Sequence, residues 1–177
     1  MFVFNNQQEL ASKNIIRFLD STDKFFLLEG DPGTGKTTII SKIFENDIYK
    51  KKKIAFCATT NKAVTVLEQY SSLKGKNIAY TTIQKLLNIK RNIDETGREL
   101  YTYNNDNNQC NKFNLKDFHV VLIDESSMIC EDMLEGIIQK SRYSKTKIIF
   151  IGDRNQLPPV NEKISNVFTI DFGKNKV

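Results

Sequence analysis

The 177-residue sequence has few of the residues from which disulfide frameworks and metal sites are built. Its three cysteines, Cys57, Cys110 and Cys130, lie far apart and lack metal-ligand spacing. An odd number of cysteines without a secretory signal argues against a disulfide framework and favours a reducing compartment. The single histidine, His119, precedes a predicted buried strand and is interpreted as structural rather than catalytic.

Long hydrophobic runs and targeting signals are also missing. Residues 1–6 have neither a basic start nor a long apolar stretch, so they do not form a signal peptide. The apolar runs at 120–123 and 148–151 are too short to cross a bilayer. We therefore expect a soluble, cytoplasmic protein with no membrane partner.

Positive charge is in modest excess, with 26 Lys and Arg against 21 Asp and Glu and a net charge of +5. This balance suits a polyanionic partner but is common among soluble proteins. Part of the excess lies in four consecutive lysines at 50–53. Two interpretations of this run stay open: a solvated segment leading into a strand, or a binding patch.

The rest of the chain alternates between short apolar runs and segments with helical spacing. This alternation predicts one α/β domain with a parallel sheet, right-handed crossovers and helices on both sheet faces. The expected strands are 25–28, 54–58, 120–123 and 147–151, and the expected helices are 7–20, a helix after the glycine-rich segment through residue 44, 62–70, 82–87 and 131–140.

The polar, Asn-rich segment 88–117 breaks this rhythm. Within it, 88–93 and 98–103 flank Asp94–Gly97, and Gly97 can supply a positive φ, which predicts an inserted β-hairpin. The alternative is a surface loop, partly disordered at 104–111.

A glycine-rich segment between the first strand and the following helix matches G-x-x-x-x-G-K-[ST]. Glycines let backbone N–H groups curl around a β-phosphate at a helix N-terminus. Lys36 is expected to reach the β- and γ-phosphates, and the Thr37 hydroxyl to ligate Mg²⁺. The alternative is an ordinary glycine-rich turn. The residues predicted to bind the nucleotide here are Gly30, Asp31, Pro32, Gly33, Thr34, Gly35, Lys36, Thr37 and Thr38.

Two acidic residues, Asp124 and Glu125, follow the apolar run 120–123. This places their carboxylates at the carboxyl edge of a parallel sheet, where such folds bind ligands. Asp124 is expected to hold Mg²⁺ through water, and Glu125 to act as general base toward the attacking water. Alone, an Asp-Glu pair after a strand is more often a helix cap.

A third polar segment follows the apolar run 148–151. Its Gln156 carries a neutral amide that can sense a γ-phosphate by hydrogen bonding, and Pro158 and Pro159 stiffen the loop. From the residues alone, a rigid surface turn is an equal alternative.

In this order, the segments resemble the motifs of superfamily 1 DNA helicases, specifically the 5′-to-3′ branch of RecD-like and Dda-like enzymes. Residues 4–8 resemble the Q motif, which implies that Gln8 reads adenine. Residues 30–38 resemble motif I, 124–128 motif II, and 152–160 motif III. The match at motif III favours the sensing role for Gln156. The resemblance implies a RecA-like P-loop lobe that binds ATP and Mg²⁺, with Lys36, Glu125 and Gln156 as catalytic residues.

The resemblance also implies contacts with single-stranded DNA. Residues 58–63 resemble motif Ia, with Thr59 where proline is usual, and 82–87 resemble motif Ib, with Gln84 where histidine is common. The residues expected at the strand are Thr60, Lys62, Thr82 and Gln84, although Lys62 fits a solvated helix start equally well. In this branch a β-hairpin pin parts the duplex, which implies that Tyr101 and Tyr103 stack on bases. The alternative is that they pack the hairpin onto the lobe.

The expected function is therefore the ATP-binding first motor lobe of a DNA helicase, with DNA repair or recombination as its setting. The family continues with a second lobe that carries an arginine finger, and this sequence ends at 173–177 without it. We expect residues 1–177 to form one lobe, truncated at its C-terminus, that binds ATP and hydrolyses it slowly or not at all alone. The alternatives are a stand-alone module that a partner completes in trans, and a P-loop phosphotransferase without a nucleic-acid role.

Overall fold

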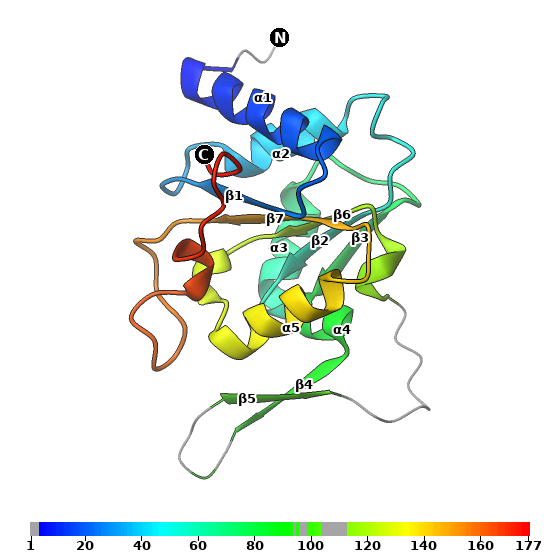
Figure 1. The fold of residues 1–177 in the computed structure, drawn as a ribbon. Helices are drawn as coiled ribbons and strands as arrows, with labels where there is room; N and C mark the ends of the chain where they lie inside the picture. The colour runs from blue at the N-terminus through cyan, green and yellow to red at the C-terminus, as the bar shows by residue number, and fades with distance from the viewer. Residues whose placement is uncertain (1–3, 94, 96–98, 104–112) are drawn as a thin grey trace.

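The computed structural model describes residues 4–93, 95, 99–103 and 113–177 (Figure 1). Its helices and strands, in chain order, are α1 (Asn6–Asp20), β1 (Phe25–Glu29), α2 (Lys36–Phe44), β2 (Ile54–Ala58), α3 (Asn61–Tyr70), β3 (Ile78–Thr82), α4 (Ile83–Leu87), β4 (Ile89–Ile93), β5 (Glu99–Tyr103), β6 (Val120–Ile123), α5 (Glu131–Ser141) and β7 (Lys147–Gly152). Three short 3₁₀ turns are η1 (Leu115–Asp117), η2 (Ser126–Met128) and η3 (Asn166–Phe168).

The central sheet has five parallel strands in the order β1-β7-β6-β2-β3. The predicted α/β class with a parallel sheet is thereby confirmed. Because successive side chains of a strand point to opposite faces, each strand feeds two cores. Helices α1 and α2 pack on the face that carries Phe26 and Leu28, whereas α4 and α5 pack on the face that carries Leu27 (Figure 1).

Strand β3 was not predicted. It lies at the edge of the sheet and pairs only with β2 among the described strands. Its burial alternates, with Ile78 and Tyr80 half-buried, because an edge strand is covered less completely than a central one. The segment therefore lacks the continuous apolar run by which the other four strands are recognised in the sequence.

The ends of two helices are set by side-chain caps. Asn5 and Gln8 form a capping box at the start of α1, since each side chain bonds the other residue's backbone N–H. Thr82 caps α4 through its hydroxyl, so this helix begins one residue later than the predicted range. His119 holds the segment before β2, because its Nδ1 accepts from the Lys53 N–H at 2.9 Å.

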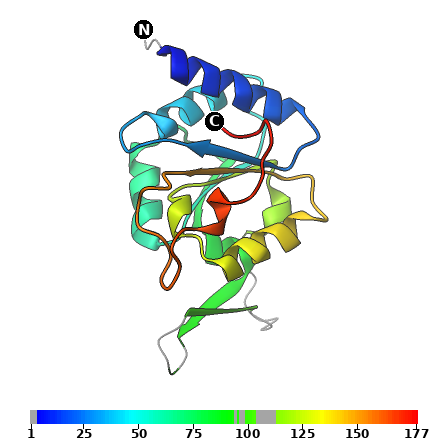
Figure 2. The same ribbon diagram turned by 60° about the vertical axis from the view of Figure 1, so that its left-hand side comes forward.

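The strands β4 and β5 form a separate antiparallel pair, with Ile89 opposite Tyr103. This is the segment in which the sequence predicts an inserted hairpin. Figure 2 shows the pair projecting away from the main sheet. Ile89 is buried in the core and Tyr101 packs against it, so the base of the hairpin is anchored on the lobe. The predicted disordered stretch 104–111 lies outside the described residues.

The C-terminal residues run beside β1. Leu27 N–H donates to the Asn175 carbonyl at 2.9 Å, and Val177 N–H donates to the Leu27 carbonyl at 3.0 Å. Lys176 forms a parallel bridge with Leu27, which extends the sheet at its β1 edge. Within the part of the chain that the structure describes, no helix has the length and apolarity needed to cross a membrane.

Candidate nucleotide and nucleic-acid sites

The glycine-rich loop connects the carboxyl end of β1 to the start of α2. Gly33 and Gly35 have φ values of 78° and 85°, in the left-handed region that costs other residues about 1–2 kcal/mol. Gly35 also lacks space for a side chain, since a Cβ there would lie 2.8 Å from Nε2 of Gln8. The loop conformation therefore requires the glycines that the motif supplies.

The same loop leaves backbone donors unpaired. No acceptor in the described part of the chain pairs with the N–H groups of Gly33, Gly35 or Lys36. These groups lie at the N-terminus of α2, where unpaired donors and the helix dipole favour an anion. The loop thus has the donor set that a nucleotide phosphate needs.

Lys36 is folded back onto this loop. Its Nζ donates to the Gly30 carbonyl at 2.5 Å and to the Asp31 carbonyl at 2.9 Å. To reach a phosphate, the ammonium has to exchange these two neutral acceptors for charged ones, which form stronger hydrogen bonds.

Gln8, predicted to read adenine, is brought to the loop by the start of α1. Its Nε2 donates to the Thr34 carbonyl at 3.0 Å, while its Oε1 accepts from the Asn5 N–H at 3.1 Å. The Q-motif segment therefore lies directly against the phosphate loop, although the two are 26 residues apart in the sequence.

Asp124 stands at the carboxyl end of β6. Its Oδ1 accepts from the Glu125 N–H at 3.0 Å. Burial raises the pKa of the Asp124 carboxyl, whereas this hydrogen bond and the charge of Lys36 oppose the rise. The interaction with Lys36 places the two predicted site residues close together.

Glu125 adopts the left-handed conformation with φ 53° and ψ 43°, which is unusual for a residue other than glycine. Partial burial raises the pKa of its carboxyl, and the neighbouring Asp124 charge raises it further. Glu125 is nevertheless exposed. An accessible carboxylate with a raised pKa and a strained backbone is suited to accept a proton.

Thr37 and Asp124 are suited to hold Mg²⁺. Thr37 is the second residue of α2, on the helix that begins with Lys36, and Asp124 is within electrostatic reach of Lys36. A hydroxyl and a carboxylate are the hard oxygen donors that Mg²⁺ takes beside phosphates and water. The residues present therefore fit the ion.

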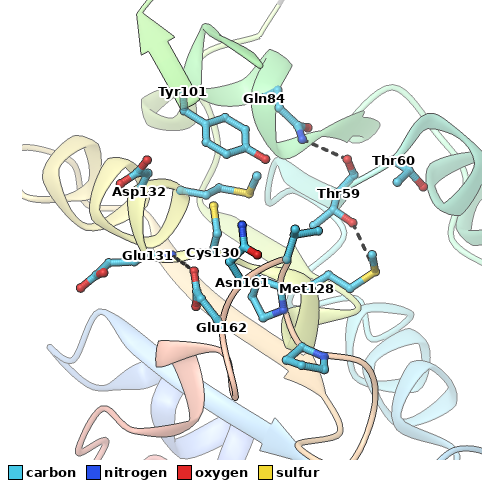
Figure 3. Close-up of a pocket in the computed structure, with 14 residues that line it drawn as sticks. Thr59, Thr60, Gln84, Tyr101, Met128, Cys130, Glu131, Asp132, Asn161 and Glu162 are labelled. Carbon is cyan, nitrogen blue, oxygen red and sulfur yellow. Dashed lines mark hydrogen bonds between the residues drawn. The ribbon is translucent and has the colours of Figure 1, made fainter. Parts of the chain in front are cut away.

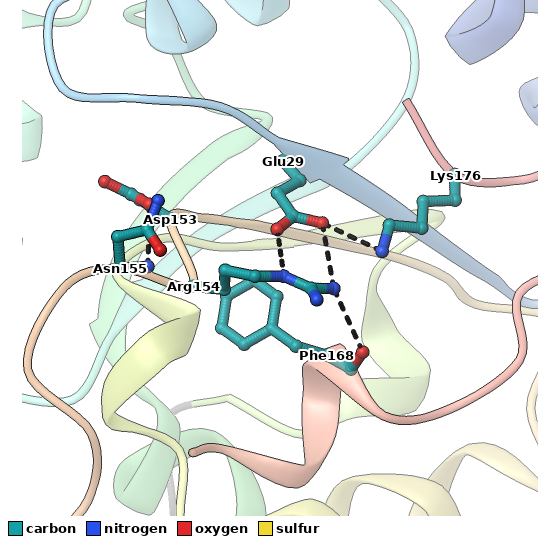
Figure 4. A network of polar contacts seen from close by, with 6 residues as sticks. All are labelled: Glu29, Asp153, Arg154, Asn155, Phe168 and Lys176. Carbon is teal, nitrogen blue, oxygen red and sulfur yellow. Dashed lines mark hydrogen bonds and ion pairs between the residues drawn. The ribbon is translucent and has the colours of Figure 1, made fainter. Parts of the chain in front are cut away.

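The segment after β7 is tied to the end of β1, directly before the phosphate loop, by an ion-pair network that the sequence did not predict (Figure 4). The Arg154 guanidinium donates to Glu29 at 2.5 Å and 3.4 Å, and Lys176 Nζ lies 2.9 Å from the same carboxylate. Burial alone raises the pKa of Glu29, but the hydrogen bonds and charges of Lys176 and Arg154 outweigh it and lower the pKa. The strand register places Glu29 opposite Gly152, and nothing in the local sequence of Arg154 indicates that neighbour.

Asp153 shapes the loop that carries Gln156. Its Oδ1 accepts from the Asn155 N–H at 2.8 Å, and its carbonyl accepts from the Gln156 N–H at 3.2 Å. Asp153 is buried, whereas Gln156 is exposed. The predicted sensor residue therefore stands on a rigid turn with its side chain accessible.

A pocket of about 570 Å³ lies beside this loop (Figure 3). In Figure 3, Gln84 and Tyr101 approach it from one side, and Asn161 and Glu162 from the other. Thr60 also lines it, so three of the residues predicted to contact a nucleic acid strand gather around one cavity. The side-chain Nε2 of Gln84 donates to the Thr59 carbonyl at 3.0 Å, while its Oε1 is buried without a partner among the described residues.

The other predicted strand contacts lie elsewhere. Lys62 lines a neighbouring pocket of about 360 Å³ that also includes Asp124 and Glu125. Thr82 is buried and its hydroxyl accepts from the Lys85 N–H, so the structure gives this side chain a capping role and does not place it in the larger pocket. The side chain of Tyr103 lies outside the described residues.

Three carboxylates in the larger pocket were not predicted as site residues. They belong to Glu131, Asp132 and Glu162. The Glu131 N–H donates to Glu162 Oε1 at 3.0 Å, which joins the start of α5 to the loop after Pro159. Glu131 and Asp132 are acidic residues in the first turn of α5. Acidic residues are common at helix starts, so the sequence alone does not show that these two line a pocket.

Comparison with known proteins agrees with this geometry. Residues 4–169 match the AAA domain family AAA_30. The chain is 36% identical to uncharacterized protein R530 of Acanthamoeba polyphaga mimivirus, over 94% of this chain and 36% of that protein. It is 35% identical to the RecBCD enzyme subunit RecD of Buchnera aphidicola subsp. Acyrthosiphon pisum, over 87% of this chain and 26% of RecD. The chain thus spans about a third or less of the length of these relatives.

A solved structure shares the fold. It is that of Bacteroides sp Pif1 in complex with ADP-AlF4, which matches with a TM-score of 0.60 and 21% sequence identity. The match covers 92% of this chain and 35% of the Pif1 chain. At this identity the match supports the fold, which is the predicted P-loop type.

Proposed function

The chain belongs to the AAA domain family and is a RecA-like lobe of the RecD type found in superfamily 1 helicases, and from this premise we propose that it binds ATP with Mg²⁺ as the first motor lobe of an ATP-dependent DNA helicase. One observation carries the proposal. The unpaired N–H groups of the phosphate loop, the Lys36 ammonium and the Asp124–Glu125 pair meet at the carboxyl edge of one parallel sheet.

In the proposed mechanism the loop N–H groups and Lys36 bind the β- and γ-phosphates, and Gln8 reads the adenine. Thr37 and Asp124 would hold Mg²⁺, which would supply positive charge to offset that of the phosphates. Glu125 accepts a proton from the attacking water, as its raised pKa and accessibility support. Gln156 contacts the γ-phosphate by hydrogen bonding and remains neutral.

The strand of DNA is proposed to pass over the 570 Å³ pocket. Thr60 and Gln84 contact its backbone, and Tyr101 stacks on a base at the root of the hairpin. Lys62 meets a phosphate between this pocket and the catalytic carboxylates. Segment 88–117, with β4 and β5, acts as the pin that parts the duplex during 5′-to-3′ translocation.

Translocation requires two lobes that close on ATP between them. A second lobe also supplies an arginine finger, whose loss costs about 10³–10⁵ in turnover. We therefore expect this lobe alone to bind ATP and to hydrolyse it slowly or not at all, with full activity after pairing with a second lobe, in the same chain or in trans.

The test is ATP binding and hydrolysis by the purified chain, with and without a single-stranded oligonucleotide. Binding without turnover supports a half-motor, whereas DNA-stimulated turnover supports a site completed by self-association. Absence of ATP binding contradicts the proposal.

The Glu125→Gln variant separates binding from chemistry. It is expected to keep the ATP dissociation constant within about twofold and to reduce any hydrolysis by about 10²–10⁴, since the general base is lost. Glu135→Gln, an exposed change on α5, is the matched control and should leave both quantities unchanged. Unchanged turnover in Glu125→Gln would identify another base.

A further inference from the structure

A second pocket, of about 520 Å³, lies at the opposite edge of the sheet. Its lining residues come from the end of α1, the connection between α2 and β2, the segment that leads into β6 and the turn before β7. Because all strands of the sheet are parallel, these segments gather at the amino ends of the strands, away from the phosphate loop. We call this cavity the amino-edge pocket.

The floor of the amino-edge pocket is apolar. Tyr49 and Phe118 are buried and line the cavity, as does Ile48, which has 72% of its surface exposed. What distinguishes Ile48 from other exposed apolar side chains is that it lines a cavity with an apolar floor, so a bound apolar group would cover it together with Tyr49 and Phe118. The remaining apolar lining comes from Leu19 and Val120.

The rim of the amino-edge pocket is basic. Lys52, Lys116 and Lys145 are exposed, and no described residue pairs with their amines. Lys147 differs, because its Nζ points inward and donates to three backbone carbonyls.

Two aspartates, Asp20 and Asp117, also line the pocket. Oδ2 of Asp117 accepts a hydrogen bond from the Asn114 N–H at 2.9 Å. Four lysines against two aspartates leave an excess of positive charge around the apolar floor.

We propose that the amino-edge pocket binds an acidic peptide segment of a partner protein, with one large apolar side chain of that segment seated on the floor. The carboxylates of such a segment pair with the three rim lysines, and the apolar side chain covers Ile48. A nucleic acid backbone would use the lysines but would gain nothing from the apolar floor. The four consecutive lysines at 50–53 thereby acquire a binding role at Lys52.

This inference is independent of the nucleotide site, which lies at the other edge of the sheet. The Lys36→Ala variant is therefore expected to bind the peptide as well as the unaltered chain does. Loss of ATP binding and loss of peptide binding are thus separate results.

The experiment measures the fluorescence anisotropy of a labelled octapeptide that carries six acidic residues followed by isoleucine and phenylalanine. We expect a dissociation constant on the order of 10–100 µM that weakens with added salt, as paired surface charges do. Lys116→Glu with Lys145→Glu should weaken binding at least about tenfold, and Ile48→Ser at least about threefold. A second peptide carries serines in place of both apolar residues. Its affinity for the unaltered protein should be no higher than the affinity of the first peptide for the Ile48→Ser variant.

The matched control carries Lys74→Glu with Lys76→Glu, two exposed lysines outside the pocket, and should bind normally. Because all altered side chains are exposed, circular dichroism should show an unchanged fold. A labelled Ile48 methyl group in the unaltered protein gives a second readout, since its NMR signal should shift on titration with the peptide.

Two results would overturn the proposal. If the Ile48→Ser variant and the serine peptide bind normally, and the Ile48 methyl signal stays in place, the attraction is only one of charge. If a 20-base-pair duplex binds through Lys116 and Lys145 while the peptide does not, the surface is a nucleic-acid site.

Discussion

The two edges of the central sheet differ in how their backbone polar groups are paired. At the amino edge, the Lys147 ammonium donates to the carbonyls of Phe18, Ser21 and Asp23 at 2.8–2.9 Å, which caps the C-terminal end of α1. Lys24 does the same beyond α5, donating to three carbonyls between residues 141 and 144 at 2.6–3.0 Å. Cations at helix C-termini satisfy carbonyls that have no partner within the helix.

At the carboxyl edge, the N–H groups of Gly33, Gly35 and Lys36 have no acceptor among the described residues, and two glycines of the phosphate loop have positive φ. Glu125 is held in a left-handed conformation, and the carboxyls of Asp124 and Glu125 have raised pKa values. The difference indicates that Lys24 and Lys147 contribute stability at the amino edge, while the phosphate loop and the Asp124–Glu125 pair give up stability for the ligand binding proposed at the carboxyl edge.

The largest effect that would sharpen this comparison is expected from Lys36→Ala. Removing the ammonium should weaken ATP binding by about 100-fold or more, since charge-assisted bonds to phosphate are lost, and should leave the unfolding midpoint almost unchanged. Titration calorimetry measures both ATP affinity and stoichiometry. Lys42→Ala on the same helix is the control, because its exposed pair with Glu45 contributes little. Retained affinity in Lys36→Ala would remove the phosphate-loop assignment.

The next effect concerns the amino edge. Lys147→Met keeps the apolar stem but leaves three carbonyls without their donor, so we expect the free energy of unfolding to fall by about 2–4 kcal/mol. ATP affinity should stay the same. Urea denaturation measures the loss, and the exposed Lys145→Met should change stability by no more than about 0.5 kcal/mol. Equal stability of the two variants would show that the capping contacts contribute nothing.

The smallest expected effect is a gain in stability, from Asp124→Asn. Because burial raises the pKa of Asp124, the folded chain binds this proton more tightly than the unfolded chain. Stability contributed by the neutral form is therefore lost as pH rises through the raised pKa. At neutral pH, Asp124→Asn should raise the free energy of unfolding by about 0.5–2 kcal/mol while weakening Mg²⁺-dependent nucleotide binding.

The pH dependence checks the cause of that gain. The gain in the free energy of unfolding should shrink as pH falls toward the ordinary carboxyl range, where Asp124 itself becomes neutral. Urea denaturation at several pH values tests this, with the exposed Asp47→Asn as control. A gain that does not depend on pH would mean that charge burial is not its source.

Much of the fold follows from local pattern. Four of the five strands in the main sheet are continuous apolar runs, because parallel strands are buried on both faces, and the phosphate loop is recognised from consecutive residues. Edge strand β3 was not predicted because half-buried Ile78 and Tyr80 alternate with buried residues, so its sequence lacks a continuous apolar run. The roles assigned to Lys62, Thr60 and Gln84 remain predictions, and Thr82 shows how one hydroxyl in a motif can equally well cap a helix.

The sequence by itself determined the groups whose roles depend on their neighbours in the chain: the loop from Gly30 to Thr38 and the Asp124–Glu125 pair. Only the tertiary structure decided which distant groups meet. The register of β1 against β7 joins Glu29 to Arg154, and the packing of α1 brings Gln8 to Thr34. The adjacent positions of β2, β6 and β7 in the sheet gather Lys52, Lys116 and Lys145 around one cavity. The physical reason is that a local pattern depends on backbone period and turn geometry, whereas these contacts depend on which strands become neighbours in the sheet.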